Sequence, residues 1–425
     1  MRFKEDLLHY IWKYKRFNHR DLKTTEGLDL NIEKYGIHNH GSGPDFHNSL
    51  ISLDGTKWAG NVEIHIKSSD WNNHKHQHDK AYDNVILHVV YEHDKEIFNS
   101  KNQNLPTLEL KSRIDPKLID QYHKIYENTS WIPCGSQIAN VDSLIVHQAM
   151  DRALIQRLER KSQSIVDSLK YYNNDWDKVC YQSIATSLGA KINKNAFEQL
   201  ARISPWEIIA KHGDNLVQIE AILIGQAGLL SEDFKDQYHA KLKDEYEFLK
   251  HKYNLESMKR EAWQFSGLRP ASFPHVRVAQ LARILWRQPR MFAQIKSLDE
   301  LKDIDKLFQV SLDGYWDTHY NFTKESKSKK KAIGAVVRYN LLINSVIPLL
   351  FTYGDLMKDE ELKNRALSFL NQMKSESNNI IKKWQELGVK SDCAGDSQGL
   401  LELKNECCTF KKCLACPIGV ALLKS

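Results

Sequence analysis

The stretch GPDFHNSLISLDGTKWAGNVEIHIKSSDW, residues 43–71, reads as a β-hairpin. Its two runs of alternating apolar and polar residues are joined by Asp54-Gly55, a pair that is common in two-residue hairpin turns. Next along the chain, NVILHVVYEHD at 84–94 is rich in β-branched residues and suits a strand that is buried on both faces. Strand-like runs at 28–36 and 105–111, and an amphipathic helix predicted over 1–20, complete an expected mixed sheet with flanking helices.

The second hairpin strand carries three kinds of polar side chain on one face. Because side chains alternate along a strand, the segment VEIHIK at 62–67 groups Glu63, His65 and Lys67 opposite its apolar residues. A carboxylate, an imidazole and an amine can serve as a metal ligand, a base and a charge stabiliser. A solvated polar face is the simpler interpretation of an isolated strand, so the neighbouring residues decide between the two.

Two carboxylates near this strand have the arrangement that hard divalent cations require. The turn Gly43-Pro44-Asp45 holds one carboxylate at the start of the first strand, and Glu63 follows on the second. Mg²⁺ and Mn²⁺ prefer one or two carboxylates, with waters and substrate phosphate oxygens as their other ligands. We therefore predict Asp45 and Glu63 as ligands of a catalytic ion, and Asp70, where the strand ends, as the best further acidic candidate.

Histidines are concentrated near these carboxylates, since eleven of the 18 fall in the first 93 residues. In the polar loop NNHKHQHDKAYDN, residues 72–84, three histidines alternate and are followed by Asp79; two of them with Asp79 would suit zinc. A substrate-lining role for His74 and His78 is the alternative that we favour, because the loop leaves the sheet at the end of the Glu63 strand. Tyr82 would position a phosphate or pack into the core. His88 would join the site only if its strand lies beside that of Glu63.

Beyond Pro133 the pattern becomes helical. Apolar residues recur at helical spacing, and we expect helices around 141–170, 176–189, 194–202, 215–230, 235–250, 274–288, 332–350, 359–388 and 398–405. The basic run SKSKKK at 326–331 is expected to be a solvated loop. The chain is thus predicted to be α+β, with a mixed-sheet domain at 1–130, a larger all-helical domain at 131–390 and a Cys-rich tail at 391–425.

The tail contains a metal-binding pattern. Five of the seven cysteines lie in the last 33 residues, and CCTFKKCLACPIG at 407–419 includes Cys408-x4-Cys413-x2-Cys416. Three cysteines at this spacing suit a tetrahedral Zn²⁺ or a 4Fe-4S iron–sulfur cluster, and coincidental buried thiols are the alternative. Adjacent Cys407 is an awkward fourth ligand because neighbouring side chains point apart. We predict Cys134, in WIPCG, as the fourth ligand of a structural clasp.

Composition sets broad limits on function. Of the 425 residues, 41% are hydrophobic and 27% are charged, as in ordinary globular proteins. No apolar run of about 18 residues and no signal-peptide pattern is apparent, so we expect a cytoplasmic protein with no membrane partner. The net charge of +6 permits a nucleic-acid partner without requiring one. Nothing in the sequence indicates an oligomeric state.

Two resemblances add to these expectations. Pro44-Asp45 followed by Glu63-Ile64-His65 resembles the signature of restriction-endonuclease-like nucleases, which is Pro-Asp, a variable gap, then Asp or Glu, any residue and Lys. The resemblance implies a mixed sheet with flanking helices, metal binding by Asp45 and Glu63, and His65 in the place of the water-orienting Lys, with Lys67 as a substitute amine. GPDF, GNVEIHIKSSDW, YDNVILHVVYE, GQAGLL, LRPASFPHVRVAQLA, INSVIPLLFTYG and the Cys-rich end also resemble an uncharacterised bacterial family, found mostly in Bacteroidota, which implies no function.

The first of these resemblances leads us to expect a nuclease that uses Mg²⁺ or Mn²⁺ and acts on DNA or RNA. Arg269 and Arg277, which flank two prolines in LRPASFPHVR, would bind substrate phosphates at a helix start, or form a structural pair. An inactive nuclease-like module that binds nucleic acid or protein is the first alternative, because His65 replaces the usual Lys. A zinc hydrolase built on the loop histidines is the second.

Overall fold

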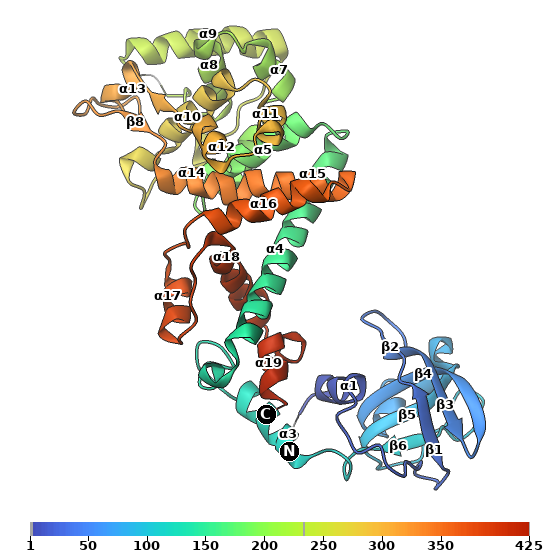
Figure 1. Cartoon of the computed structure of the whole chain (residues 1–425). Coiled ribbons are helices and arrows are strands. Elements are labelled where there is room, and N and C mark those ends of the chain that lie inside the picture. Colours follow the sequence, from blue (N-terminus) through green and yellow to red (C-terminus); the bar gives the residue numbers. More distant parts are fainter. Residues whose placement is uncertain (1–2, 233, 425) are drawn as a thin grey trace. The chain divides into compact units, whose positions relative to one another are not determined.

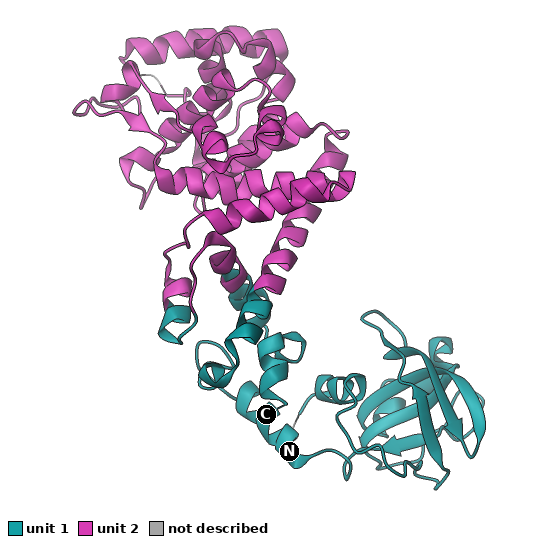
Figure 2. Cartoon of the chain, viewed as in Figure 1, with its two compact units in different colours: residues 1–150, 383–389, 401–425 teal, residues 151–382, 390–400 magenta. Residues whose placement is uncertain are grey.

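The computed structural model describes residues 3–232 and 234–424, and the chain divides into two compact units (Figures 1 and 2). The first unit comprises residues 1–150, 383–389 and 401–425, and the second comprises 151–382 and 390–400. The first contains the sheet and the second is mainly helical, so the chain is α+β as predicted. The cysteine-rich segment after residue 400 belongs to the unit that contains the sheet.

The sheet is mixed, in agreement with the sequence. Its strands are β1 (Leu30–Lys34), β2 (Ile37–His38), β3 (Phe46–Leu53), β4 (Thr56–Lys67), β5 (Val85–Glu92) and β6 (Thr107–Glu109). They lie in the order β1-β3-β4-β5-β6, with β2 paired to β3. The β1–β3 and β3–β4 pairs are antiparallel, whereas β4, β5 and β6 are parallel. The long strand β4 is therefore central, with its hairpin partner β3 on one side and the buried strand β5 on the other.

The hairpin turn has the conformation that its residues favour. Asp54 and Gly55 have positive φ angles of 44° and 83°, and they connect Leu53 to Thr56, the last register pair of β3 and β4. A two-residue turn with both φ angles positive matches the twist of the flanking strands, and Asp-Gly accommodates it at low cost. The turn sets the register from Leu53–Thr56 to Ser49–Gly60, and a shift between Phe46 and Ser49 then pairs Phe46, next to Asp45, with Val62 in the middle of β4.

Helix α1 (Glu5–Lys13) contacts β4 and is shorter than the predicted span of 1–20. It buries Leu7, Leu8, Ile11 and Trp12, the apolar face read from the sequence. Lys15 adopts a left-handed φ of 54°, which ends the helix. The loop after β4 forms short turns, α2 (Asp70–Asn73), η1 (His76–His78) and η2 (Lys80–Tyr82), and α3 (Pro116–Tyr126) follows the sheet.

The helical segments read from the sequence are observed, with altered boundaries. They are α4 (Ser143–Tyr171), α5 (Trp176–Leu188), α6 (Lys194–Ile203), α8 (Leu216–Gln226), α9 (Gln237–Tyr253), α10 (Pro274–Arg287), α16 (Glu360–Gln372), α17 (Asn379–Glu386) and α18 (Ala394–Glu402). The single helix expected over 359–388 is thus two helices. The sequence did not predict the short helices α7 (Trp206–Lys211), α11 (Met291–Ser297), α12 (Leu301–Leu307) and α13 (Tyr315–Thr318), or the two-residue strands β7 (Ser311–Leu312) and β8 (Lys331–Ala332). Elements this short contain too few residues to show a period.

One long helical stretch passes through the core of the second unit. It consists of α14 (Ala335–Leu341), a π-helical segment η6 (Leu342–Val346) and α15 (Ile347–Met357). By length and composition, 335–357 would be long enough to cross a membrane, but 61% of its most apolar window is buried inside the protein, as in a core helix. Just before it, Lys331 is buried and its Nζ donates to the carbonyl of Asp317 at 2.9 Å, so the basic run 326–331 is not entirely a solvated loop.

Candidate metal centre

Backbone hydrogen bonds hold the two predicted carboxylates, Asp45 and Glu63, close together at the start of the hairpin. Asp45 directly precedes β3, after a turn in which Gly43 has a φ of 93°. The Asp45 Oδ2 accepts a hydrogen bond from the backbone N–H of Ile64 at 2.9 Å, and the Asp45 N–H donates to Glu63 Oε2 at 3.1 Å. The turn and the central strand thereby hold two carboxylates in one place, and only 5% of Glu63 is exposed.

Three imidazoles lie next to these carboxylates. Glu63 Oε1 is 3.6 Å from His65 Nε2 and 3.4 Å from His76 Nε2, and His65 Nε2 is 3.1 Å from His74 Nδ1. One ligand nitrogen from each of these histidines lies within 4.8 Å of the others. Because imidazole nitrogens lie about 2.0–2.1 Å from a bound zinc ion, small side-chain rotations would bring all three to a single cation.

Two further histidines support this cluster from neighbouring elements. His88 on β5 is the register partner of Glu63, is fully buried, and has its Nε2 2.7 Å from His65 Nδ1. His9 on α1 places its Nε2 3.2 Å from Asp45 Oδ2. A histidine that binds metal through Nε2 carries its proton on Nδ1, and His88 Nε2 is in position to accept that proton from His65. The condition set for His88 by the sequence, that its strand lies beside that of Glu63, is met.

The buried imidazoles are held in their neutral form. Burial, followed by the charges of His76, His74 and His9, lowers the pKa of His65 to about 3. Burial, with His65 next in importance, lowers the pKa of His88 well below its usual value. Neutral imidazole is the form that binds metal. His65 and His88 are therefore in the protonation state that metal binding requires.

The carboxylates experience the opposite effect. Burial raises the pKa of Glu63, although His76 opposes this shift, and burial also raises the pKa of Glu5 on α1. Burial acts to lower the pKa of His9, but its hydrogen bond to Asp45 and the charge of that carboxylate outweigh burial and raise it. Buried carboxylates that lack sufficient positive charge are costly, and a bound cation would remove this cost.

The hydrogen bonding of His76 and His88 tests whether these residues fit a metal. The Nε2 of His76 is buried and forms no hydrogen bond of acceptable geometry among the described residues, and neither does Nδ1 of His88. Buried polar atoms without a partner cost free energy, so native proteins seldom leave them unused. His76 Nε2 lies 3.4 Å from Glu63 Oε1, so this nitrogen and that oxygen are placed to share one cation. The donor set, carboxylate oxygen plus imidazole nitrogen, suits Mn²⁺ or Zn²⁺ better than Mg²⁺.

Lys67 and Asp70 lie beyond the cluster, at the end of β4. Lys67 is exposed, and its Nζ is 3.9 Å from Asp94 Oδ2. Asp70 accepts the backbone N–H of Lys67 at 3.1 Å and the side-chain amide of Asn73 at 3.1 Å, so its carboxylate caps the turn that follows the strand. The structure therefore does not bring the Lys67 amine to the two carboxylates, and imidazoles occupy that place.

The other predicted loop residues differ in their positions. The Tyr82 ring stacks on the His76 ring at a centroid distance of 3.8 Å, and burial, with Glu63 and Asp45, raises the pKa of Tyr82 to about 12. His78 is exposed and is not among the three clustered histidines. Sequence analysis missed Glu5 and His9. Their i, i+4 spacing places them on one face of α1, but that signal does not show that the face meets β4.

The two predicted arginines belong to the second unit. Arg277 on α10 donates to Gln280 Oε1 at 2.8 Å and to Ser272 Oγ at 3.3 Å, and burial lowers its pKa. These contacts are those of a structural arginine that holds the turn before α10. Arg269 is exposed, and its backbone carbonyl accepts the N–H of Ser272 at 2.8 Å.

Five of the seven cysteines, Cys134, Cys407, Cys408, Cys413 and Cys416, lie in the first unit. None of the seven, all of which are described, forms a disulfide. Burial, followed by the charges of Cys134, Cys416 and Cys413, raises the pKa of Cys408. Burial and then Cys134 and Cys416 raise the pKa of Cys413 to about 12. Cys134 is therefore close to the three tail cysteines, and its role as the fourth ligand stays a prediction. Cys407 also acts on Cys408 and Cys413 and so lies nearby.

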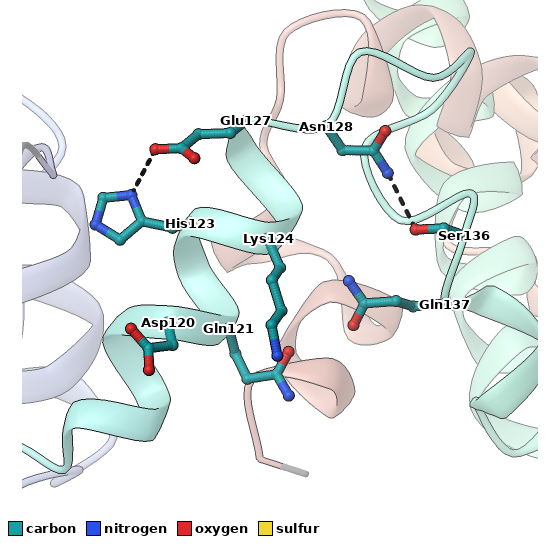
Figure 3. Close-up of a pocket in the computed structure, with 8 residues that line it drawn as sticks. All are labelled: Asp120, Gln121, His123, Lys124, Glu127, Asn128, Ser136 and Gln137. Atoms are coloured by element: carbon teal, nitrogen blue, oxygen red, sulfur yellow. Dashed lines mark hydrogen bonds and ion pairs between the residues drawn. The ribbon is translucent and has the colours of Figure 1, made fainter.

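A separate polar cavity of about 760 Å³ lies along α3 (Figure 3). Its side chains include an ion pair between His123 Nδ1 and Glu127 Oε1 at 3.0 Å and a hydrogen bond from Asn128 Nδ2 to Ser136 Oγ at 3.2 Å. The residues that line it include none of the predicted ligands. Two of its charged groups, His123 and Glu127, are paired with each other, and within the described part of the chain the cavity brings together no group of metal-ligating side chains.

Comparison with known proteins places the chain in one family. A family model described as "Protein of unknown function (DUF2851)" matches residues 5–379. No curated protein and no solved structure gave a match. The match includes the carboxylate–histidine cluster and Cys134, and it ends before the three tail cysteines.

Proposed function

The chain belongs to the DUF2851 family of proteins of unknown function, and we propose that its first unit is a divalent-metal-dependent nuclease that hydrolyses phosphodiester bonds of DNA or RNA. One observation carries the proposal. Glu63 Oε1 lies 3.6 Å from His65 Nε2 and 3.4 Å from His76 Nε2. Asp45, 18 residues earlier in the sequence, is joined to Glu63 by a hydrogen bond from its backbone N–H to Glu63 Oε2. This is a mixed oxygen and nitrogen donor set in which Glu63 and His65 are buried and His74 is exposed.

Each residue of the site would have a distinct role in the reaction. Asp45 and Glu63 would bind the ion, with the clustered imidazoles completing its ligands, and His88 would fix the orientation of His65. A cation bound there would activate a water and neutralise charge on the scissile phosphate. Tyr82, whose high pKa keeps its hydroxyl protonated, would donate a hydrogen bond to a phosphate oxygen. The imidazoles favour Mn²⁺ over Mg²⁺.

A second candidate function is favoured by the same three histidines. Their three ligand nitrogens lie within 4.8 Å of one another, and Glu63 next to them could provide a fourth ligand of a zinc ion. A zinc hydrolase would hold Zn²⁺ stoichiometrically after purification. The His78 and Asp79 ligands considered from the sequence are not part of this cluster, so the site would differ from that earlier expectation. An inactive module that only binds nucleic acid or protein would require neither ion.

Cleavage assays with matched variants test the proposal. Labelled single- and double-stranded DNA and RNA are incubated with Mg²⁺, Mn²⁺ or Zn²⁺, and metal content is measured in parallel. Asp45→Asn and Glu63→Gln should each lower Mn²⁺-dependent cleavage by about a hundredfold or more, because each removes a metal ligand. Lys80→Gln, at an exposed position of the same loop with no predicted role, is the control and should retain activity. Equal cleavage in all four proteins rules the assignment out. Binding without cleavage under every metal establishes the inactive module, and bound zinc with hydrolysis only of other esters establishes the zinc hydrolase.

We also propose that Cys134, Cys408, Cys413 and Cys416 hold a structural Zn²⁺ or 4Fe-4S cluster. Each of Cys134, Cys408 and Cys413 has its thiol pKa raised by burial and by neighbouring thiols of the group, which supports this proposal. A bound metal would deprotonate the thiols and compensate the cost of burying their charge. A cytoplasmic location, which keeps such thiols reduced, remains an expectation from the sequence.

A further inference from the structure

A basic cavity of about 810 Å³ lies entirely among residues of the second unit. Its lining contains five cationic side chains and a single carboxylate, that of Glu198, which forms an ion pair with Arg202 at 2.6 Å. The cationic residues are Arg157, Arg160 and Lys161 on α4, and Lys191 and Lys194 near the turn between α5 and α6. Neither the nuclease proposal nor the cysteine clasp uses this cavity.

Helical periodicity explains why α4 presents this face. Arg157, Arg160, Lys161, Ser164 and Ser168 follow one another at spacings of one to four residues, and all of them line the cavity. Helix α5 contributes hydroxyl and amide groups, which are Gln182, Ser183, Thr186 and Ser187. Hydroxyl groups beside guanidinium and ammonium groups provide many hydrogen-bond donors for an oxyanion.

The π-helical segment η6 holds one of the cations in place. The Asn344 side chain accepts a hydrogen bond from Lys161 Nζ at 2.7 Å. Ser345 Oγ donates to the carbonyl of Ser183 at 2.8 Å and is 2.7 Å from Ser187 Oγ, so η6 is tied to α5 at the cavity wall. π-Helical turns cost stability and occur frequently at functional sites. This turn interrupts the core helix at the point where it meets the basic face.

The charges around Lys161 repel one another. Burial, followed by Arg157, Arg160 and Lys194, lowers the pKa of Lys161 to about 7, whereas Glu376 acts in the opposite direction. These cations disfavour the charged form of Lys161, and an anion in the cavity would offset their effect. Protonation of Lys161 would accompany anion binding.

We propose that this cavity binds a small molecule that carries two or more phosphate groups. Several cations beside hydroxyl groups match multiple phosphates better than one carboxylate. The volume is typical of small-molecule sites. Among its lining residues, all of them described, none is aromatic, so the cavity offers no ring on which a nucleic-acid base would stack.

Calorimetric titration of the full chain at fixed ionic strength tests this proposal. The probes are tripolyphosphate, orthophosphate and sulfate. We expect one site for tripolyphosphate. Orthophosphate and sulfate, which each carry only one such group, should bind at least about tenfold more weakly. Lys161→Gln and Lys194→Gln should each raise the Kd about tenfold, the value of one charge-assisted hydrogen bond. Lys170→Gln, on the exposed part of the same helix and paired with Asp167, is the matched control and should bind as the wild type does.

Two further measurements keep the result interpretable. Thermal melting followed by circular dichroism identifies any variant that fails to fold. If Lys161→Gln or Lys194→Gln does not fold, the affinity of the other variant tests the proposal. Asp45→Asn should bind tripolyphosphate normally, so failure of the nuclease assignment leaves this proposal intact. Equal affinity in wild type, Lys161→Gln and Lys194→Gln overturns it. It is also overturned if a short single-stranded oligonucleotide displaces tripolyphosphate and binds more tightly, because the cavity would then be part of a nucleic-acid backbone groove.

Discussion

Buried histidines in this protein have two different roles, which their neighbours distinguish. His65 lies among carboxylates and other imidazoles, whereas His275 on α10 lies among aromatic rings. The His275 ring is 5.4 Å from the Phe322 ring and 5.8 Å from the Phe265 ring, and only 5% of the residue is exposed. A lone imidazole of this kind is a core residue, and its chemistry appears only as a dependence of stability on pH.

That dependence has a definite sign. Burial, with Arg260 and His239 next, lowers the pKa of His275 to about 3 from its usual value of 6.5. Between these values the unfolded chain binds a proton that the folded chain does not, so stability falls as pH falls through this window. The slope for one such group is up to about 1.4 kcal/mol per pH unit. Urea unfolding between about pH 7 and about pH 5 should therefore be less pH-dependent in His275→Gln than in wild type. Identical slopes in the two proteins would show that His275 titrates normally.

At the scale of elements, the sequence predicted what depends on local rules. The Asp-Gly turn, the alternation along β4 and the long amphipathic helices all follow from residues near one another in the chain. The errors have local causes too. A left-handed Lys15 ended α1 early. Lys67 is the last residue of β4, and its exposed amine lies beside Asp94 rather than beside the two carboxylates.

The turn that carries the tail cysteines depends on one glycine. Helix α19 (Pro417–Leu422) begins directly after Cys416, and a Cβ added to Gly419 would lie 2.2 Å from the carbonyl oxygen of Cys413. No side chain can adjust to relieve a contact with backbone. Gly419→Ala should therefore separate α19 from the cysteine turn, at a cost of about 1–3 kcal/mol. Metal content and melting temperature should both fall.

Gly41→Ala is the control for this substitution. It lies in the same unit, and its added Cβ would meet nothing closer than 3.4 Å. Its melting temperature and metal content should match those of wild type. If Gly419→Ala behaves in the same way as Gly41→Ala, the close approach between α19 and Cys413 does not limit the cysteine cluster.

At the scale of the whole molecule, the candidate sites depend on contacts between distant parts of the sequence. The pairing of Asp45 with Glu63 was predictable because a hairpin connects them. The contribution of His9 was not, because only tertiary packing determines that α1 covers β4. The basic cavity needed α4, α5 and η6 together, and η6 begins more than 170 residues after the arginines of α4. Cys134 was predicted only through the coordination number of the metal, which the three tail cysteines do not satisfy.

Cys134 and the tail cysteines give the most direct test of long-range organisation in the first unit. If Cys134, Cys408, Cys413 and Cys416 share one ion or cluster, Cys134→Ser and Cys408→Ser should both abolish metal content and expose the tail to protease, because structural metal binding is folding free energy. Cys393→Ser is the control, since its thiol contacts Asn371 in the second unit and should leave the metal in place. Anaerobic purification followed by elemental analysis identifies the ion as zinc or as iron with labile sulfide. Full metal content in Cys134→Ser, together with loss in Cys407→Ser, would mean that the tail binds its metal alone. Residues 401–425 would then belong to the sheet-bearing unit through packing, without a metal link.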